Sequence, residues 1–271
     1  MTHDAPLILA AALYAAALVL LYNSIREQSP GWRTLSLTFA VAGALFHAGM
    51  QISHWFGEGA QDVSLPHLLS LCALVIMLLL IASAFTRRTL YDAGLVALPI
   101  AAAVVLLEWV ALPQPIPLDG ATPGIALHLI SSVLSFGLLS IAGVYTFFAY
   151  LADYFLRHHH INPLVRTLPA LEVLEDLLFR LIAAGFLLLT ISLASGVVFI
   201  SDIFAQHLVH KTVLSIFAWL VFGLLLWGRW RHGWRGRLAV RLTLGGIALL
   251  VLSYFGSKFV LEILLDSNWQ A

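Results

Sequence analysis

The sequence predicts an all-α membrane protein, a polytopic helix bundle with about eight transmembrane helices. Of its 271 residues, 61% are hydrophobic and only 10% are charged, whereas a soluble domain has about 25% charged residues. The apolar residues gather in runs long enough to span a bilayer, and the arginines fall on alternate connections between these runs. Such a composition suits a lipid-facing surface, so we expect a single integral membrane domain over residues 1–271.

The expected helices follow from the apolar runs, since a spanning helix needs about 20 mostly apolar residues. Turn-forming residues separate the runs, as in Ser29-Pro30-Gly31 and in the four prolines between residues 113 and 124. The first run has no preceding positive region and no small-residue cleavage site, so we interpret it as a spanning helix and not a signal peptide. The expected spans are residues 6–22, 35–53, 65–85, 91–112, 125–155, 177–200, 209–227 and 242–265.

The arginines predict the orientation, because cytoplasmic loops of membrane proteins carry an excess of Lys and Arg. Arg26 and Arg33 lie between the first two helices, Arg87 and Arg88 follow the third, and other arginines follow the fifth and seventh. The opposite connections are mainly acidic. With an even number of spans, we expect both termini outside and a multi-pass protein of the cell inner (cytoplasmic) membrane.

Several function classes are disfavoured by what the sequence lacks. Its net charge is zero, so no basic field for nucleic acid exists. Its one cysteine, Cys72, allows neither an internal disulfide nor a CxxC redox pair. No HExxH, Walker or GxGxxG motif occurs, and no serine is arranged with histidine and aspartate as in a hydrolase. We therefore expect a protein that is not an enzyme.

Histidines in the outer half of the membrane are the main functional candidates, because polar groups at bilayer depth are costly. His47 and His54 share a face of the second helix, His128 opens the fifth, and His207 and His210 open the seventh. Neutral imidazole ligates iron, and two imidazoles can hold a haem axially. We consider His47, His128 and either His207 or His210 as haem-iron ligands. The alternative is interfacial histidines bonded to water, backbone or each other.

Two charged residues on the same side have simpler explanations. Glu108 and Lys258 lie toward the outer ends of the fourth and eighth helices. They can extend to the membrane interface or pair across the bundle. His67, at the start of the third helix, is on this side too.

Short motifs in the second half occur in an informative order. His128-Leu-Ile-Ser-Ser opens the fifth helix, and Asp176-Leu-Leu-Phe-Arg180 begins the sixth. Lys211-Thr-Val-Leu-Ser215 begins the seventh, and Tyr254-Phe-Gly-Ser257 lies in the eighth. Over about residues 125–265, the order of these motifs resembles that of the cytochrome c assembly protein family. Its members are haem-handling membrane proteins of the CcsA and CcmC type. The sequence is most similar to the YpjD/HemX-like inner-membrane branch of that family.

The resemblance implies a non-covalent, b-type haem on the outer face, flanked by two external histidines under a tryptophan-rich segment. His128 matches the first of these histidines, and His47 matches a position kept in the YpjD-like branch. Residues 197–210 contain no tryptophan, and residues 255–268 contain no histidine. The second ligand therefore stays open, with His207 and His210 as the alternatives.

The function that the resemblance implies is haem binding or haem handling in support of cytochrome c biogenesis. Expected partners are membrane lipid and a membrane protein of a cytochrome c assembly system or a transporter. The alternative is a haem-free membrane partner, or a regulator of a transporter or of tetrapyrrole synthesis, on the same scaffold. A transporter in its own right is a third hypothesis, but no pair of broken helices supports it.

Overall fold

The computed structural model describes residues 4–56, 64–86, 88–111, 122–158, 171–199 and 209–256. In these ranges the chain is helical with short junctions, and no strand occurs among them. Eight helices within these ranges are long and apolar enough to cross a membrane. The expectation of an all-α, eight-span membrane protein is thus confirmed, while the orientation of the termini stays a prediction.

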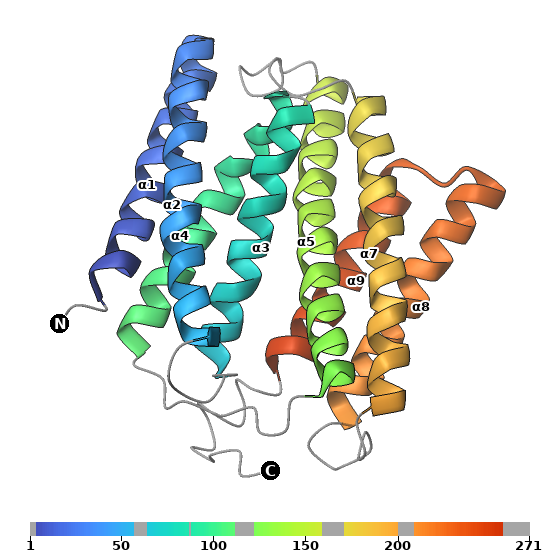
Figure 1. Ribbon diagram of the computed structural model, residues 1–271. Helices are drawn as coiled ribbons and strands as arrows, with labels where there is room; N and C mark the ends of the chain where they lie inside the picture. The colour runs from blue at the N-terminus through green and yellow to red at the C-terminus, as the bar shows by residue number, and fades with distance from the viewer. Residues whose placement is uncertain are drawn as a thin grey trace. The chain divides into compact units, whose positions relative to one another are not determined.

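The helices form two compact units. The first contains α1 (Asp4–Glu27), α2 (Pro30–Phe56), α3 (Leu65–Thr86), the short 3-10 helix η1 (Arg88–Ala93) and α4 (Gly94–Ala111). Here α1 packs against α2 and α4, and α3 packs against α2 and α4 (Figure 1). Helix α2 starts at Pro30, five residues before the expected start, because proline suits the first turn of a helix.

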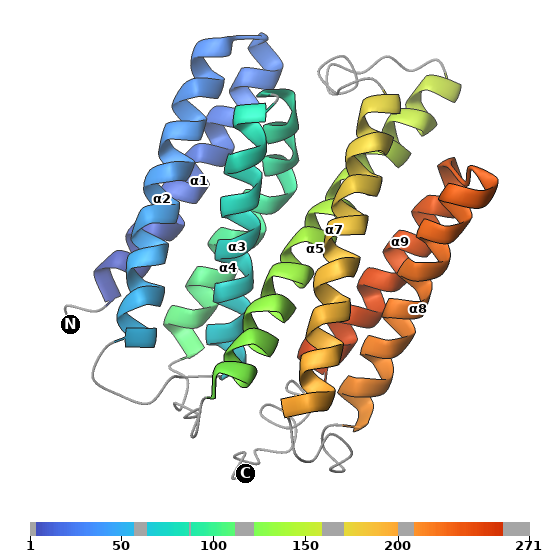
Figure 2. The same cartoon turned by 45° about the vertical axis from the view of Figure 1, so that its right-hand side comes forward.

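The second unit contains most of α5 (Pro123–Arg157), namely its residues up to Tyr150. It also contains α7 (Leu171–Phe199), α8 (Val209–His232), α9 (Gly236–Val251) and the π-helical turn η2 (Leu252–Gly256). Helix α8 packs against α9 and η2, as the second view shows (Figure 2).

Two boundaries in the second unit test the sequence-based expectations. Gly233 and Gly236 adopt φ angles of 65° and 61°, which glycine tolerates, and they form the turn between α8 and α9. Helix α7 starts at Leu171, six residues before the expected start. Residues 257–265 of the eighth expected helix lie outside the described ranges. The single domain over residues 1–271 stays a prediction.

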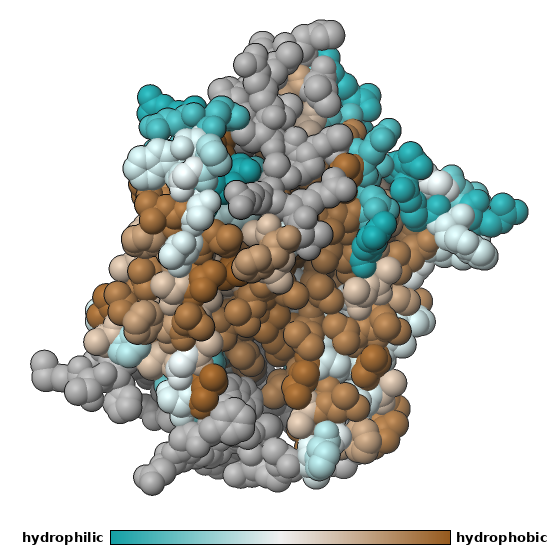
Figure 3. All heavy atoms as spheres, turned by 45° about the horizontal axis from the view of Figure 1, so that its top comes forward, coloured by the Kyte–Doolittle hydropathy of each residue, from teal (hydrophilic) through white to brown (hydrophobic). Residues whose placement is uncertain are grey.

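The surface of the protein is apolar where a soluble protein would be polar. Large side chains such as Phe85 and Trp230 are 78% and 84% exposed, whereas His47 and Asp92 are fully buried. In Figure 3, apolar residues cover the middle of the visible face, and strongly hydrophilic residues gather toward its top. This inverted pattern places lipid against the helices and polar groups inside the units.

Candidate functional site

His128 lies near the start of α5, in the second unit, and the local sequence explains how this helix begins. Pro123 is the first residue of α5, and the Thr122 hydroxyl accepts a hydrogen bond from the Ile125 backbone N–H at 3.4 Å. Proline in the first turn and threonine at the N-cap are both typical helix starts. His128 therefore lies in the second turn of a helix with a well-defined beginning.

The imidazole of His128 has a fixed orientation. Its Nδ1 lies 2.8 Å from the backbone carbonyl oxygen of Ser192 on α7. A carbonyl only accepts hydrogen bonds, so Nδ1 carries the hydrogen, and in the neutral ring Nε2 is left with the lone pair. Histidines that bind metals commonly donate their other N–H to a backbone carbonyl in this way. His128 thus has the tautomer that iron ligation through Nε2 requires.

The Ser192 carbonyl is itself held in place. The Ser195 hydroxyl donates to it at 3.0 Å, and the Ser192 hydroxyl bonds that of Ser132 on α5. At the same end of the unit, a Cβ on Gly124 would lie 2.3 Å from the ring of Phe199, so only glycine permits this approach of α5 to α7. The hydrogen bonds between α5 and α7 therefore keep the acceptor of the His128 ring in place.

A cleft opens beside His128 within the second unit. The cleft has a volume of about 130 Å³ and is open to its surroundings on one side. Cofactor sites are commonly larger, about 300–1,000 Å³, and are mostly apolar with a few convergent polar groups, so the cleft resembles such a site in its lining and not in its volume. The lining comes from α5, α7, α8 and η2 and consists of His128, Ser132, Leu189, Ser192, Leu193, Gly196, Val197, Lys211, Thr212, Ser215, Ile216 and Tyr254.

Lys211 brings a positive charge to this cleft. Its ammonium lies 5.6 Å from the centre of the Tyr254 ring, a cation–π distance. The Ser253 hydroxyl donates to the Lys211 carbonyl at 2.8 Å and bonds the Ser215 hydroxyl at 2.7 Å. These bonds tie the start of α8 to η2, so the lysine stands on a supported backbone.

His47 lies in the first unit, and its ring is part of a buried polar network. Its Nδ1 is 3.3 Å from the Tyr14 hydroxyl, and its Nε2 is 2.7 Å from the Ser70 hydroxyl. Both nitrogens therefore have protein partners, and iron ligation by His47 would require one hydroxyl to move. Its role as a haem ligand stays a prediction.

The side chains of the other two predicted ligands are not among those that the structure describes. His207 lies outside the described residues, and His210 belongs to α8 without a described side chain. His47 belongs to the first unit and His128 to the second, so the described residues do not test whether the four predicted histidines share one site. The second axial ligand stays a prediction.

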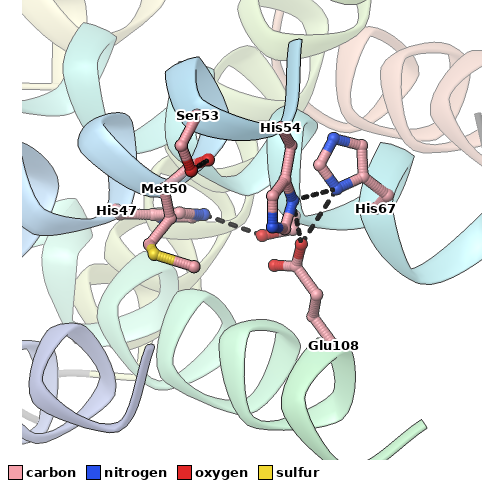
Figure 4. A network of polar contacts seen from close by, with 7 residues as sticks. His47, Met50, Ser53, His54, His67 and Glu108 are labelled. Carbon is pink, nitrogen blue, oxygen red and sulfur yellow. Dashed lines mark hydrogen bonds and ion pairs between the residues drawn. The ribbon is translucent and has the colours of Figure 1, made fainter. Parts of the chain in front are cut away.

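A second polar cluster, in the first unit, was not predicted as a group. His54, His67 and Glu108 converge from α2, α3 and α4, as Figure 4 shows. Glu108 was expected to reach the membrane interface or to pair across the bundle. Its carboxylate lies 3.0 Å from Nδ1 of His67. Lys258 lies outside the described residues. The sequence analysis placed all three residues on the same side of the membrane. That shared depth was the one feature of the sequence that pointed to a cluster.

Comparison with known proteins identifies the family. Residues 35–265 match the family described as Cytochrome C assembly protein. The chain belongs to the cytochrome c assembly protein family. The expectation from the motifs of the second half is thereby confirmed, and the match extends into α2 of the first unit.

Several relatives of this family member are described. It is 31% identical to the inner membrane protein YpjD of Escherichia coli K12, over 95% of this chain and 98% of YpjD. It is 33% identical to an uncharacterized 28.8 kDa protein of the nifR3-like 5′ region of Azospirillum brasilense, over 86% of each chain. It is 29% identical to the cytochrome c biogenesis protein CcsA of Gloeobacter violaceus, over 36% of this chain and 30% of CcsA.

No solved structure shows a significant match to the chain. The likeness to YpjD along nearly the whole chain and the eight apolar helices together place the protein in the inner membrane, as a multi-pass protein. The expected location is confirmed.

Proposed function

We propose that this protein binds haem in the cleft beside His128 and handles it in support of cytochrome c assembly. One observation carries the proposal. The Nδ1–H of His128 donates to the Ser192 carbonyl, which leaves the Nε2 lone pair for iron at a mostly apolar cleft.

The residues around the cleft fit the chemistry of a haem. Leu189, Leu193 and Ile216 supply apolar lining for a macrocycle, and Lys211 supplies a cation for the propionate groups. Bound haem would supply a redox-active iron whose state depends on its axial ligands and surroundings. His128 would hold that iron, while the apolar lining would keep water from it. Membrane complexes with other assembly proteins are the expected context of this activity.

The test is a haem measurement on protein purified in detergent from haem-replete cells. We expect a b-type spectrum and a pyridine haemochrome value near one haem per chain for the wild type. His128→Ala should lower the haem content about tenfold or more, since loss of metal-site groups commonly costs 10–100-fold in affinity. His158→Ala, which removes an exposed histidine after α5, is the matched control and should keep the wild-type value.

Two outcomes would contradict the proposal. A wild type without any haem signal, from cells shown to make haem, would favour the haem-free membrane partner or regulator. Equal haem content in the wild type and in His128→Ala would show that the haem is held elsewhere.

A further inference from the structure

The cluster of His54, His67 and Glu108 lies at one end of the first unit, where one end of each of three helices is found. His54 is near the end of α2, His67 is near the start of α3, and Glu108 is near the end of α4 (Figure 4). Their side chains belong to separate elements, yet they present one nitrogen or oxygen atom each to the same point. Convergence of this kind requires three helix ends in a defined register.

The distances between the three atoms match those around a small metal ion. Nδ1 of His67 is 3.0 Å from Oε1 of Glu108 and 3.2 Å from Nδ1 of His54, and the third side of the triangle is 3.8 Å. A point about 2.0 Å from all three corners of such a triangle exists, and about 2.0–2.2 Å is the bond length of zinc to histidine nitrogen and carboxylate oxygen. The three atoms are thus close enough together to ligate one ion after shifts of a few tenths of an ångström.

The hydrogen bonds of this cluster do not satisfy the buried carboxylate of Glu108. Nδ1 of His67 carries at most one hydrogen, which can serve Glu108 or His54 but not both. The Glu108 side chain is only 4% exposed, and its Oε2 has no hydrogen-bond partner among the described residues. A buried carboxylate at membrane depth is costly unless a positive charge compensates for it. One cation at the common point would accept all three lone pairs and neutralise the carboxylate.

The donor set selects the class of ion. Two imidazole nitrogens and one carboxylate oxygen are typical of first-row transition metals such as Zn²⁺ and Fe²⁺, whereas Ca²⁺ and Mg²⁺ prefer oxygen ligands. A haem does not fit, because two axial nitrogens on opposite sides of one iron would be about 4 Å apart with the macrocycle between them. The 3.2 Å between the Nδ1 atoms of His54 and His67 leaves no room for a ring.

The surroundings allow an ion to enter and a further ligand to bind. The His54 side chain is 37% exposed, while His67 is only 2% exposed, so the cluster has one open side. Three protein ligands leave a position for water in a tetrahedral site. Gln51, one turn before His54 on α2, is 3% exposed, and neither of its amide atoms bonds another described residue. Its amide is a candidate partner for such a water.

We propose that His54, His67 and Glu108 bind one divalent first-row transition-metal ion, which links the ends of α2, α3 and α4. This site is separate from the proposed haem cleft, because its ligands come from the first unit and those of the cleft from the second. The bound ion stabilises the first unit and keeps one coordination position open.

The experiment uses the full chain in detergent, without a polyhistidine tag, after removal of metal by chelation. Zn²⁺ is added, excess ion is removed by desalting, and bound zinc is measured by elemental analysis. Co²⁺ is the spectroscopic probe, because its visible d–d bands report tetrahedral ligation by nitrogen and oxygen. We expect about one ion per chain and a rise of several degrees in Tm on metal addition, as mass action requires.

Four variants locate the ion. Glu108→Gln keeps the size of the side chain and removes its charge, and His67→Ala removes a ligand; both should lower the apparent affinity about tenfold or more and abolish the Co²⁺ bands. His158→Ala and His128→Ala are the controls and should bind as the wild type does. Haem content, measured in the same samples, should fall in His128→Ala and stay unchanged in Glu108→Gln, which separates this proposal from the first.

The proposal is overturned if the folded wild type retains no zinc and shows no metal-dependent Tm. It is also overturned if Glu108→Gln and His67→Ala bind as much zinc as the wild type, which would place the ion elsewhere. Should His67→Ala not yield a monodisperse protein, Glu108→Gln and the Co²⁺ spectrum of the wild type decide the question.

Discussion

Buried ionisable pairs distinguish the first unit from the second among the described residues, although both units bury hydroxyl contacts. The first unit buries ionisable pairs: Arg33 with Asp92 at one end, and His54 and His67 with Glu108 at the other. These two ends are about 30 Å apart along α2, at 1.5 Å per residue. The second unit contains hydroxyl pairs, such as that of Ser215 with Ser253, and glycines that permit close helix contacts.

The difference teaches what holds each unit together. A charge at membrane depth is tolerated only when a partner compensates for it, so the first unit depends on specific ion pairs. Small residues and hydroxyls let helix backbones approach closely, and each contact contributes little by itself. We therefore expect single substitutions of large effect in the first unit and of moderate or small effect in the second.

The largest effect is expected from loss of the buried ion pair. One guanidinium nitrogen of Arg33 lies 2.7 and 3.0 Å from the two carboxylate oxygens of Asp92, whose side chain is fully buried. Arg33→Met leaves that carboxylate without its partner, and removal of one member of a buried pair typically costs about 3–5 kcal/mol. The unfolding free energy in mixed detergent micelles measures the loss.

The matched control is Arg157→Met. Arg157 pairs with Asp153 at 2.9 Å within α5, but its side chain is 61% exposed. An exposed pair of this kind contributes little, so we expect almost no change in unfolding free energy. Equal losses in the two variants would show that burial of Asp92 does not decide the stability of the first unit.

The sequence predicted much of the fold, because apolar runs and the placement of arginine are properties of single segments. Helix starts were less accurate. Helix α2 was expected from residue 35 and begins at Pro30, since Arg33 is compatible with a helix once Asp92 pairs with it. A hydropathy pattern places the start of the helix after the charged Arg33, although the helical backbone begins before it.

The candidate sites were predicted in part. His128 was identified as a candidate, but its orientation depends on a backbone carbonyl 64 residues away, which no local pattern reports. His54, His67 and Glu108 were placed on one side of the membrane, yet their convergence was not predicted. Depth in the bilayer follows from position along a helix, whereas convergence depends on how each helix is rotated about its axis.

A moderate effect is expected where helices of the second unit approach most closely. A Cβ on Gly185 of α7 would lie 2.7 Å from Cγ of Leu139 on α5, which is too close for an undistorted contact. Gly185→Ala should therefore lower the unfolding free energy by about 1–3 kcal/mol, as overpacking does.

Gly245→Ala is the control, since a Cβ there meets nothing within 4 Å. It should be neutral or stabilising, because alanine favours helix over glycine. Two variants of equal stability would argue against close packing as the main constraint on α5 and α7.

The smallest effect is expected from a single hydroxyl at the same contact. Ser135 on α5 donates a hydrogen bond to the Gly185 carbonyl at 2.8 Å, whereas Ser131 donates within its own helix, to the Leu127 carbonyl at 2.7 Å. Hydrogen bonds between helices in membranes contribute about 0.6 kcal/mol on average, so Ser135→Ala should lower the unfolding free energy by roughly that amount.

Ser131→Ala is the control. It should leave the unfolding free energy unchanged or slightly raised, since a hydrogen bond from serine to its own helix is neutral or mildly unfavourable. Both values come from the same unfolding assay. If Ser131→Ala were the more harmful change, the hydroxyls of the second unit would act on the shape of α5 and not as links between α5 and α7.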